Sequence, residues 1–150
     1  MNISYISILS CEELEKYSDI ISEIGRYWWT KTSSFSPGRV KRIKNRGDGC
    51  RAGLLPTDIS GVRPCAILQL DPSDKEFWMR RKITHGSKVR YGLWDWTVLD
   101  VNNDDLFVLC DKVIANLSFD SRYRDWEYSD LKRWFNERGE RMITGEVLNA

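Results

Sequence analysis

Apolar residues recur at helical spacing in two segments of the chain. Near the N-terminus, Ser10 and Glu13 have the spacing of a capping box, and apolar residues follow at intervals of three or four until Gly25. Near the C-terminus, Ser129 is placed to cap a second helix and Gly139 to end it. We therefore predict a first helix of about fourteen residues and a shorter second one. The predicted apolar faces are Leu14, Tyr17, Ile21 and Ile24 in the first helix and Leu131, Trp134 and Phe135 in the second.

Alternation of apolar and polar residues predicts about six short strands in the rest of the chain. The clearest signal is a hairpin, in which residues 94–101 alternate, the turn sequence NNDD follows, and residues 106–110 are apolar. Residues 54–60 are predicted to form a loop. Two main helices with short antiparallel strands indicate an α+β fold in a single domain. Weaker strand candidates are residues 3–9, the start of 26–38, 39–44 and 112–119.

The strand predicted at residues 61–70 has an unusual start. Its sequence, GVRPCAILQL, is mostly apolar in its second half, yet an arginine and a proline stand near its beginning. Pro64 has no backbone N–H donor, so it belongs at the first residues of a strand or at a sheet edge. Burying Arg63 unpaired would cost several kcal/mol, so we expect its planar guanidinium to bind loop carbonyls or a carboxylate. Both residues are assigned structural roles.

Length and composition fit one globular domain. The chain has 150 residues, of which 41% are hydrophobic, and at this length roughly two thirds of the unfolded surface is buried on folding. The first residues lack the basic and apolar regions of a signal peptide, so we expect a cytoplasmic protein with no membrane segment. The four cysteines form no C-x-x-C pair, and we therefore predict free thiols, no metal and no cofactor.

The net charge of +1 conceals a cluster of cations. Residues 39–51 contain six Lys or Arg and one Asp, whereas residues 100–105 carry only acidic charges. Such a local excess of positive charge indicates an anionic partner surface without making the whole chain a nucleic-acid binder. A solvated surface with no partner is the alternative interpretation of the same cluster.

Candidate catalytic residues are few. His85 is the sole histidine, and no nucleophile motif accompanies it. A dyad of His85 with Cys65 or Cys110 is the enzymatic alternative, although both cysteines lie in apolar runs where a buried side chain is expected. The acidic run 100–111 imitates a calcium loop but has Asp105 where the sharp turn requires glycine. We predict no catalytic residues.

Several stretches together resemble a bacterial family, the domain of unknown function 6273. Residues 91–114 and 126–136 resemble the front half of that family, and residues 8–17, 27–34 and 61–70 resemble its back half. The residues that match the front half are Trp96, Val98, Leu99 and Asp100 in the hairpin and Trp126, Glu127, Ser129, Leu131, Trp134 and Asn136 in the helix. The departures from the family pattern are Lys31, Thr32, Lys132 and Phe135.

The two halves occur in reversed order relative to that family. The resemblance therefore implies a circularly permuted domain: residues 1–70 correspond to the back half, 71–90 form a new connection, and 91–143 correspond to the front half. Permutation is tolerated where the original termini lie close together. The permuted order predicts that the strand at 61–70 pairs antiparallel with residues 93–101. That pairing forms within a monomer or, if two chains exchange halves, across a swapped homodimer.

The WW loop and the GVRP strand also resemble the end of C-type-lectin-like ligand-binding domains. This resemblance implies a C-type-lectin-like fold whose binding surface lies within residues 29–59, where the cations cluster. The leading hypothesis is a non-enzymatic binding module that holds a protein or nucleoprotein partner, with direct nucleic-acid contact included. The predicted partner-binding residues are Trp29, Arg39, Lys41, Arg42, Lys44, Arg46 and Arg51. The predicted structural residues are Trp28, Arg63, Pro64, Trp96, Trp126 and Trp134, with Trp28 and Trp29 supporting the binding face from below.

A second hypothesis is a small inhibitor encoded by a phage or mobile element. It would act on a host nucleoprotein defence complex, in the manner of an anti-CRISPR protein. The short chain, the absent signal peptide and the concentrated cations, which could compete for phosphate-binding surfaces, motivate this hypothesis. Binding that weakens steeply with salt would favour it.

Overall fold

The computed structural model of the chain describes residues 1–33, 38–44, 51–71, 73, 83–121 and 125–145. For residues 51–54 it describes the backbone only. Within these residues the chain forms two five-stranded sheets and a few short helices, which confirms the predicted α+β class. No helix in these ranges is long and apolar enough to cross a membrane.

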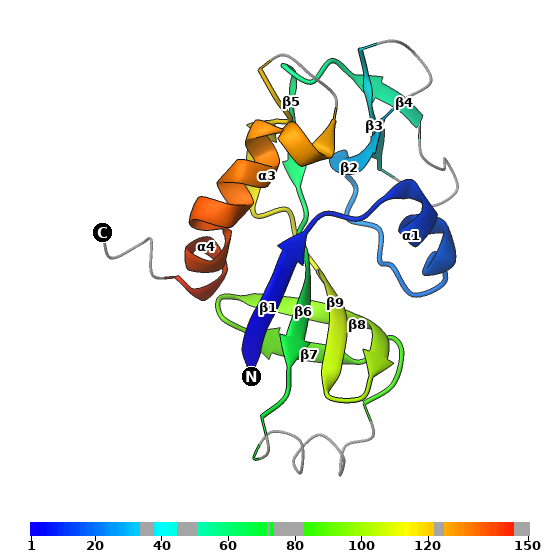
Figure 1. Ribbon diagram of the computed structural model, residues 1–150. Coiled ribbons are helices and arrows are strands. Elements are labelled where there is room, and N and C mark those ends of the chain that lie inside the picture. The colour runs from blue at the N-terminus through cyan, green and yellow to red at the C-terminus, as the bar shows by residue number, and fades with distance from the viewer. Residues whose placement is uncertain (34–37, 45–50, 72, 74–82, 122–124, 146–150) are drawn as a thin grey trace.

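The two sheets lie one above the other in Figure 1 and differ in strand direction. Sheet A is antiparallel throughout, whereas sheet B contains one parallel pair, β2 with β5. Sheet A has the order β1 (Asn2–Ser7), β6 (Cys65–Gln69), β9 (Asp105–Cys110), β8 (Trp94–Asn102) and β7 (Lys88–Tyr91). Sheet B has the order β10 (Ala115–Ser118), β5 (Ile59–Val62), β2 (Trp28–Ser33), β3 (Val40–Ile43) and β4 (Arg51–Leu54).

The hairpin predicted in the second half of the chain is confirmed as β8 and β9. Asn102 pairs with Asp105, so only two residues form the turn, and Asn103 adopts the left-handed conformation with φ of 55°. Asparagine tolerates that conformation better than most residues. The predicted loop at 54–60 is shorter than expected, because Leu54 ends β4 and Ile59 begins β5.

The first helix is much shorter than its apolar spacing predicted. Helix α1 covers only Cys11–Lys16, and the predicted capping box is present, since the Ser10 hydroxyl accepts from the Glu13 amide. The chain then continues as turns through Ser18 and Asp19, two residue types whose side chains favour turns over helix interiors. Tyr17 and Ile21 are nevertheless buried in the core. The apolar residues that have helical spacing in this segment are therefore buried by turns, without a continuous helix.

The C-terminal helix is longer than predicted. After the short η2 (Trp126–Tyr128), α3 (Asp130–Trp134) begins at the predicted cap, where the Ser129 hydroxyl accepts from the Lys132 amide. The π-helical segment η3 (Phe135–Gly139) and α4 (Glu140–Thr144) follow directly.

The expected stop at Gly139 is wrong. That residue has helical φ of −59° and is buried, with the Phe135 ring so close that a Cβ on it would lie 3.0 Å away. Gly145, at φ of 90°, ends the helix instead.

The segment predicted as one strand at 61–70 divides between the two sheets. β5 ends at Val62 in sheet B and β6 begins at Cys65 in sheet A, so Arg63 and Pro64 form the crossing between them. Pro64 therefore lies just before a strand, where its missing donor costs no ladder bond. Figure 1 shows β5 and β6 as one nearly continuous path from the upper sheet to the lower one.

The predicted pairing of this segment with residues 93–101 is wrong. β6 lies between β1 and β9, and β9 separates it from β8. The neighbour relation expected of a permuted domain is therefore absent within the chain. The alternative form of the permutation hypothesis, in which residues 61–70 pair with residues 93–101 of a second chain in a swapped dimer, stays a prediction.

The two sheets share one core. A cluster of buried residues joins Trp28 and Ile43 of sheet B to Cys65, Leu99 and Leu109 of sheet A. Because these side chains pack together, the sheets form one folding unit. Of the tryptophans assigned structural roles, Trp28 and Trp96 are buried, and Trp126 and Trp134 are half-buried beside a third cluster.

Arg63 is fully buried and fixes the crossing between the sheets. Its Nε donates to the Cys110 carbonyl at 2.6 Å, its Nη1 donates to the Ser22 carbonyl at 2.9 Å, and its Nη2 reaches the Ser22 hydroxyl at 3.2 Å. The guanidinium also lies 5.1 Å from the Trp28 ring centroid. Burial lowers the pKa of Arg63 to about 10, although the negative charge of Asp111 acts to raise it. Because this pKa is still well above 7, the guanidinium is protonated at neutral pH. The sequence-based structural role is confirmed.

Replacing Arg63 with lysine should destabilise the fold. A lysine ammonium cannot reproduce the planar fork that serves two carbonyls and a hydroxyl, so we expect a loss of about 2–4 kcal/mol in the free energy of unfolding, measured in urea. The control Arg141→Lys, at an exposed helix position, should change stability by less than about 0.5 kcal/mol. Equal small effects of both variants would contradict the role given to Arg63.

A Gly92→Ala substitution should separate the β7–β8 turn from α4. Gly92 has φ of +61°, and a Cβ there would lie 2.2 Å from the Ile143 carbonyl oxygen, which accepts a bond from the Leu93 amide. The matched control Gly25→Ala has φ of +71° but no atom within 4 Å, so it should cost only about 1–2 kcal/mol of backbone strain. We expect Gly92→Ala to lower the melting temperature clearly more than Gly25→Ala does. Equal shifts would show that the contact with Ile143 is unimportant.

Candidate functional site

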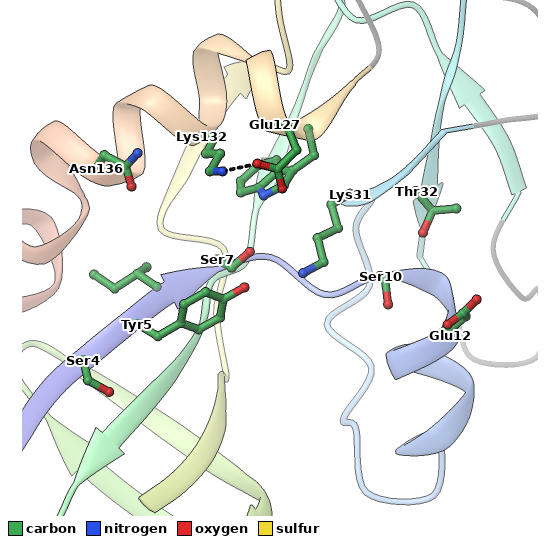
Figure 2. Close-up of a pocket in the computed structure, with 12 residues that line it drawn as sticks. Ser4, Tyr5, Ser7, Ser10, Glu12, Lys31, Thr32, Glu127, Lys132 and Asn136 are labelled. Atoms are coloured by element: carbon green, nitrogen blue, oxygen red, sulfur yellow. Dashed lines mark hydrogen bonds and ion pairs between the residues drawn. The ribbon is translucent and has the colours of Figure 1, made fainter.

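A cavity lies where β1, the start of α1, β2 and the C-terminal helix meet. Its volume is about 630 Å³, within the range of roughly 300–1,000 Å³ typical of ligand pockets. Figure 2 shows Tyr5 and Ser7 on β1 facing Lys31 from β2 and Glu127 and Lys132 from the helical side. The cavity therefore brings together segments from both ends of the chain.

Charged groups from two walls interact across this cavity. Lys132 Nζ donates to Glu127 Oε2 at 2.5 Å, and this hydrogen bond, the charge of Lys132 and the charge of Lys31 together lower the pKa of Glu127. Partial burial acts to lower the pKa of Lys31. Electrostatic interactions with Tyr5 and Glu13 outweigh this effect, so the pKa of Lys31 is raised. Lys31 is thus a cation at neutral pH and is not poised as a nucleophile or general base.

Aromatic packing fixes the helical wall of the cavity. The Trp126 ring lies 6.0 Å from both Phe119 and Phe135, measured between ring centroids. The Ser129 hydroxyl, which caps α3, also donates to the Trp126 carbonyl at 2.8 Å and so ties η2 to the helix. The sequence predicts a structural role for Trp126, and in the structure Trp126 also forms part of the cavity wall.

Backbone contacts hold the opposite wall. The Lys31 amide donates to the Leu9 carbonyl at 3.1 Å, and the Thr32 hydroxyl accepts from the Cys11 amide at 2.9 Å. Cys11 is disulfide-bonded, so the prediction of free thiols is wrong for Cys11. It holds for Cys65 and Cys110, which are free and buried.

The predicted basic face is present in part, on β3. The Arg42 guanidinium lies 3.8 Å from the centroid of the Tyr27 ring, and Lys44 Nζ lies 5.6 Å from it. Tyr27 is 37% exposed. Neither Arg42 nor Lys44 forms a salt bridge within the described part of the chain. We call Tyr27, Arg42 and Lys44 the basic face.

The remaining partner-binding candidates differ in how far the structure describes them. Arg39 and Lys41 are half-buried and have further interactions of their own. Arg46 lies outside the described residues, and only the backbone of Arg51 is described, in β4. Trp29 is fully buried, and its Nε1 donates to the Leu117 carbonyl, so the assignment of Trp29 to the contact surface is wrong. Its ring is part of a buried cluster with Val40, Val62 and Phe119.

The Cys–His dyad finds no support in the geometry. Burial raises the pKa of the Cys65 thiol strongly and that of Cys110 to about 11, opposite to the activation that a nucleophile requires. The exposed His85 lies 3.5 Å from an Asp100 carboxylate oxygen instead. No group of three or more His, Cys, Asp or Glu in the described ranges is arranged to hold a metal ion.

A second, acidic cavity of about 320 Å³ lies between α1 and the β8–β9 hairpin. Asp100 lines it, but its oxygens already have protein partners: Oδ2 accepts from the Tyr17 hydroxyl at 3.3 Å and Oδ1 from the Val101 amide at 2.9 Å. The acidic run that imitates a calcium loop is therefore occupied with bonds inside the fold.

Sequence analysis did not identify the cavity or Tyr27. Lys31 and Lys132 were noticed only as departures from the family pattern, and Tyr5 was noticed only as part of a strand. These residues are between 26 and 127 positions apart along the chain, and no local spacing indicates that they meet. Two of the four departures from the pattern, Lys31 and Lys132, are cations, and their charge was the one available signal.

Lys132→Met should raise the pKa of Glu127 toward its ordinary value. The ammonium of Lys132 stabilises the carboxylate, so removing it makes the carboxylate easier to protonate. The measurement is an NMR titration of the Glu127 side-chain carboxyl carbon between about pH 2 and 7. Arg133→Met removes a neighbouring exposed cation that pairs with Asp130 and should leave the Glu127 titration unchanged. An unchanged Glu127 titration in Lys132→Met would contradict the pairing.

Comparison with known proteins identifies no relative of this chain. It matches no protein-family model, and no curated protein or solved structure shows significant similarity to it. The resemblances to the domain of unknown function 6273 and to C-type-lectin-like domains therefore stay predictions.

Proposed function

We propose that this protein is a non-enzymatic binding module that engages an anionic surface of a macromolecular partner through the basic face. The observation that carries the proposal is the pair of cations stacked on Tyr27 without an acidic partner among the described residues. Two cations at the edge of sheet A are neutralised instead: Lys88 pairs with Asp111 at 2.9 Å and Arg90 with Asp95 at 3.2 Å. Unneutralised cations are available to an anionic group on a partner.

Stacking on Tyr27 also supports a binding role. The ring holds the Arg42 guanidinium in a fixed position, so less side-chain entropy is lost when an anion binds it. Arginine in such a position can form two parallel hydrogen bonds to a phosphate or carboxylate. The buried Trp29 lies opposite Arg42 across the two strands, on the same face of sheet B, and is a rigid neighbour of that side chain.

Phosphate-rich and carboxylate-rich partners both fit this chemistry, and salt dependence separates them. Each phosphate contact adds close to one unit to the slope of log affinity against log salt on duplex DNA. A nucleoprotein partner would therefore show a steep slope, and a purely acidic protein surface a weaker one.

Charge reversal on the basic face should weaken binding to a polyanion. The probes are a fluorescein-labelled 20-base-pair DNA duplex and a labelled heparin fragment, titrated by anisotropy at several salt concentrations. We expect Arg42→Glu with Lys44→Glu to lower affinity by about tenfold or more and to reduce the salt slope for DNA by about two.

The matched control changes net charge equally at another place. Lys112→Glu with Arg141→Glu alters two exposed cations outside the basic face and should leave affinity within about twofold. If both double variants lose affinity alike, total charge governs the attraction and the basic face has no special role. If neither variant loses affinity, the proposed function is wrong.

A further inference from the structure

The two edges of sheet A differ in their protection against a further strand. β7, at one edge, carries Lys88 and Arg90, both in salt bridges. β1, at the other edge, has the sequence NISYIS, which contains no charged residue and no proline. Proteins usually guard sheet edges with charges or prolines, because an unguarded edge accepts another strand readily. β1 is therefore the edge whose own residues include none of these guards.

The 630 Å³ cavity follows this edge. Four consecutive residues of β1, Ser4 to Ser7, line it. Successive side chains of a strand point to opposite faces of the sheet, so a cavity above one face would meet alternate residues only. Contact with every residue in turn means that the cavity runs along the edge of the strand, next to its backbone.

The register shows which backbone groups face the cavity. The Cys110 amide donates to the Pro64 carbonyl, and bonded pairs alternate along antiparallel strands, so Cys65 directs its backbone groups away from β9 and toward Ser7 of β1. Ile6, the next residue, then turns its N–H and C=O away from β6. These two groups are available to a strand in the cavity.

The opposite wall limits what can enter. Lys132 and Asn136 lie one turn apart on the C-terminal helix, and Trp126 and Glu127 precede them on η2. Figure 2 shows this helical wall facing β1 across the cavity. A strand that belongs to a second sheet, such as β1 of another copy, would bring further strands into that wall. An isolated extended segment needs only about 4.8 Å of spacing from β1.

We propose that this groove binds an extended segment of a partner polypeptide, which adds to sheet A as a strand beside β1. Its backbone bonds to the N–H and C=O of Ile6, and one apolar or aromatic side chain packs between Tyr5 and Trp126. The segment carries little net charge, because the ammonium of Lys132 is already paired with Glu127 and that of Lys31 lies 3.8 Å from Glu13. The groove is separate from the basic face, and the proposal does not rest on the function proposed above.

The test selects heptapeptides from a displayed random library on the immobilised full chain. Synthetic forms of the selected peptides are then titrated by fluorescence anisotropy against the protein and three variants. Asn136→Trp fills the groove from its helical wall and leaves the sequence of β1 unchanged, and Glu137→Trp places the same ring on the next exposed residue, outside the groove. Ile6→Pro removes the outward N–H and breaks no bond to β6.

The proposal expects selected peptides to bind Asn136→Trp and Ile6→Pro about tenfold more weakly or worse, and Glu137→Trp within about twofold. In the unaltered protein, hydrogen exchange of the Ile6 amide should slow on peptide binding by about tenfold or more, a change that does not depend on any variant folding. Three results would overturn the proposal: no peptide is selected, bound peptide leaves Ile6 exchange unchanged, or Arg42→Glu with Lys44→Glu abolishes peptide binding. The last result would assign the peptides to the basic face.

Discussion

The fold depends on the buried guanidinium of Arg63. The chain passes from sheet B to sheet A within two residues, and three donors of this side chain bind the segment after α1 and the end of β9 at that crossing. A buried charge is tolerated because its desolvation is offset by charge-assisted bonds and by the face of Trp28. Removing the side chain would leave carbonyls of both segments without their partner.

The crossing also determines how the cavity is assembled. Its walls come from β1 of sheet A, from β2 of sheet B and from the helix that follows β10. The shared core of Trp28, Ile43, Cys65 and Leu109 holds the two sheets in fixed relation below these walls. The shape of the cavity is therefore a property of the angle between the sheets as well as of the residues that line it.

The sequence predicted well what is decided locally. The capping serines at Ser10 and Ser129 and the hairpin turn at Asn103 all depend on residues within a few positions of one another, and all are present. The role of Arg63 followed from the cost of burying an unpaired charge. Failures occurred where tertiary packing decides. The strand at 61–70 gave no signal that its two halves belong to different sheets, and the buried Gly139 serves close packing against Phe135 where a helix end was expected.

The basic face and the groove beside β1 respond differently to the relation between the sheets. Tyr27 and Arg42 are positioned by β2 and β3, which are neighbours in sheet B, so their stacking is maintained within one sheet. The groove instead spans the boundary, with Ile6 on one side and Lys31 on the other. The groove therefore depends on how the two sheets are held together at the Arg63 crossing, whereas the basic face depends on sheet B alone.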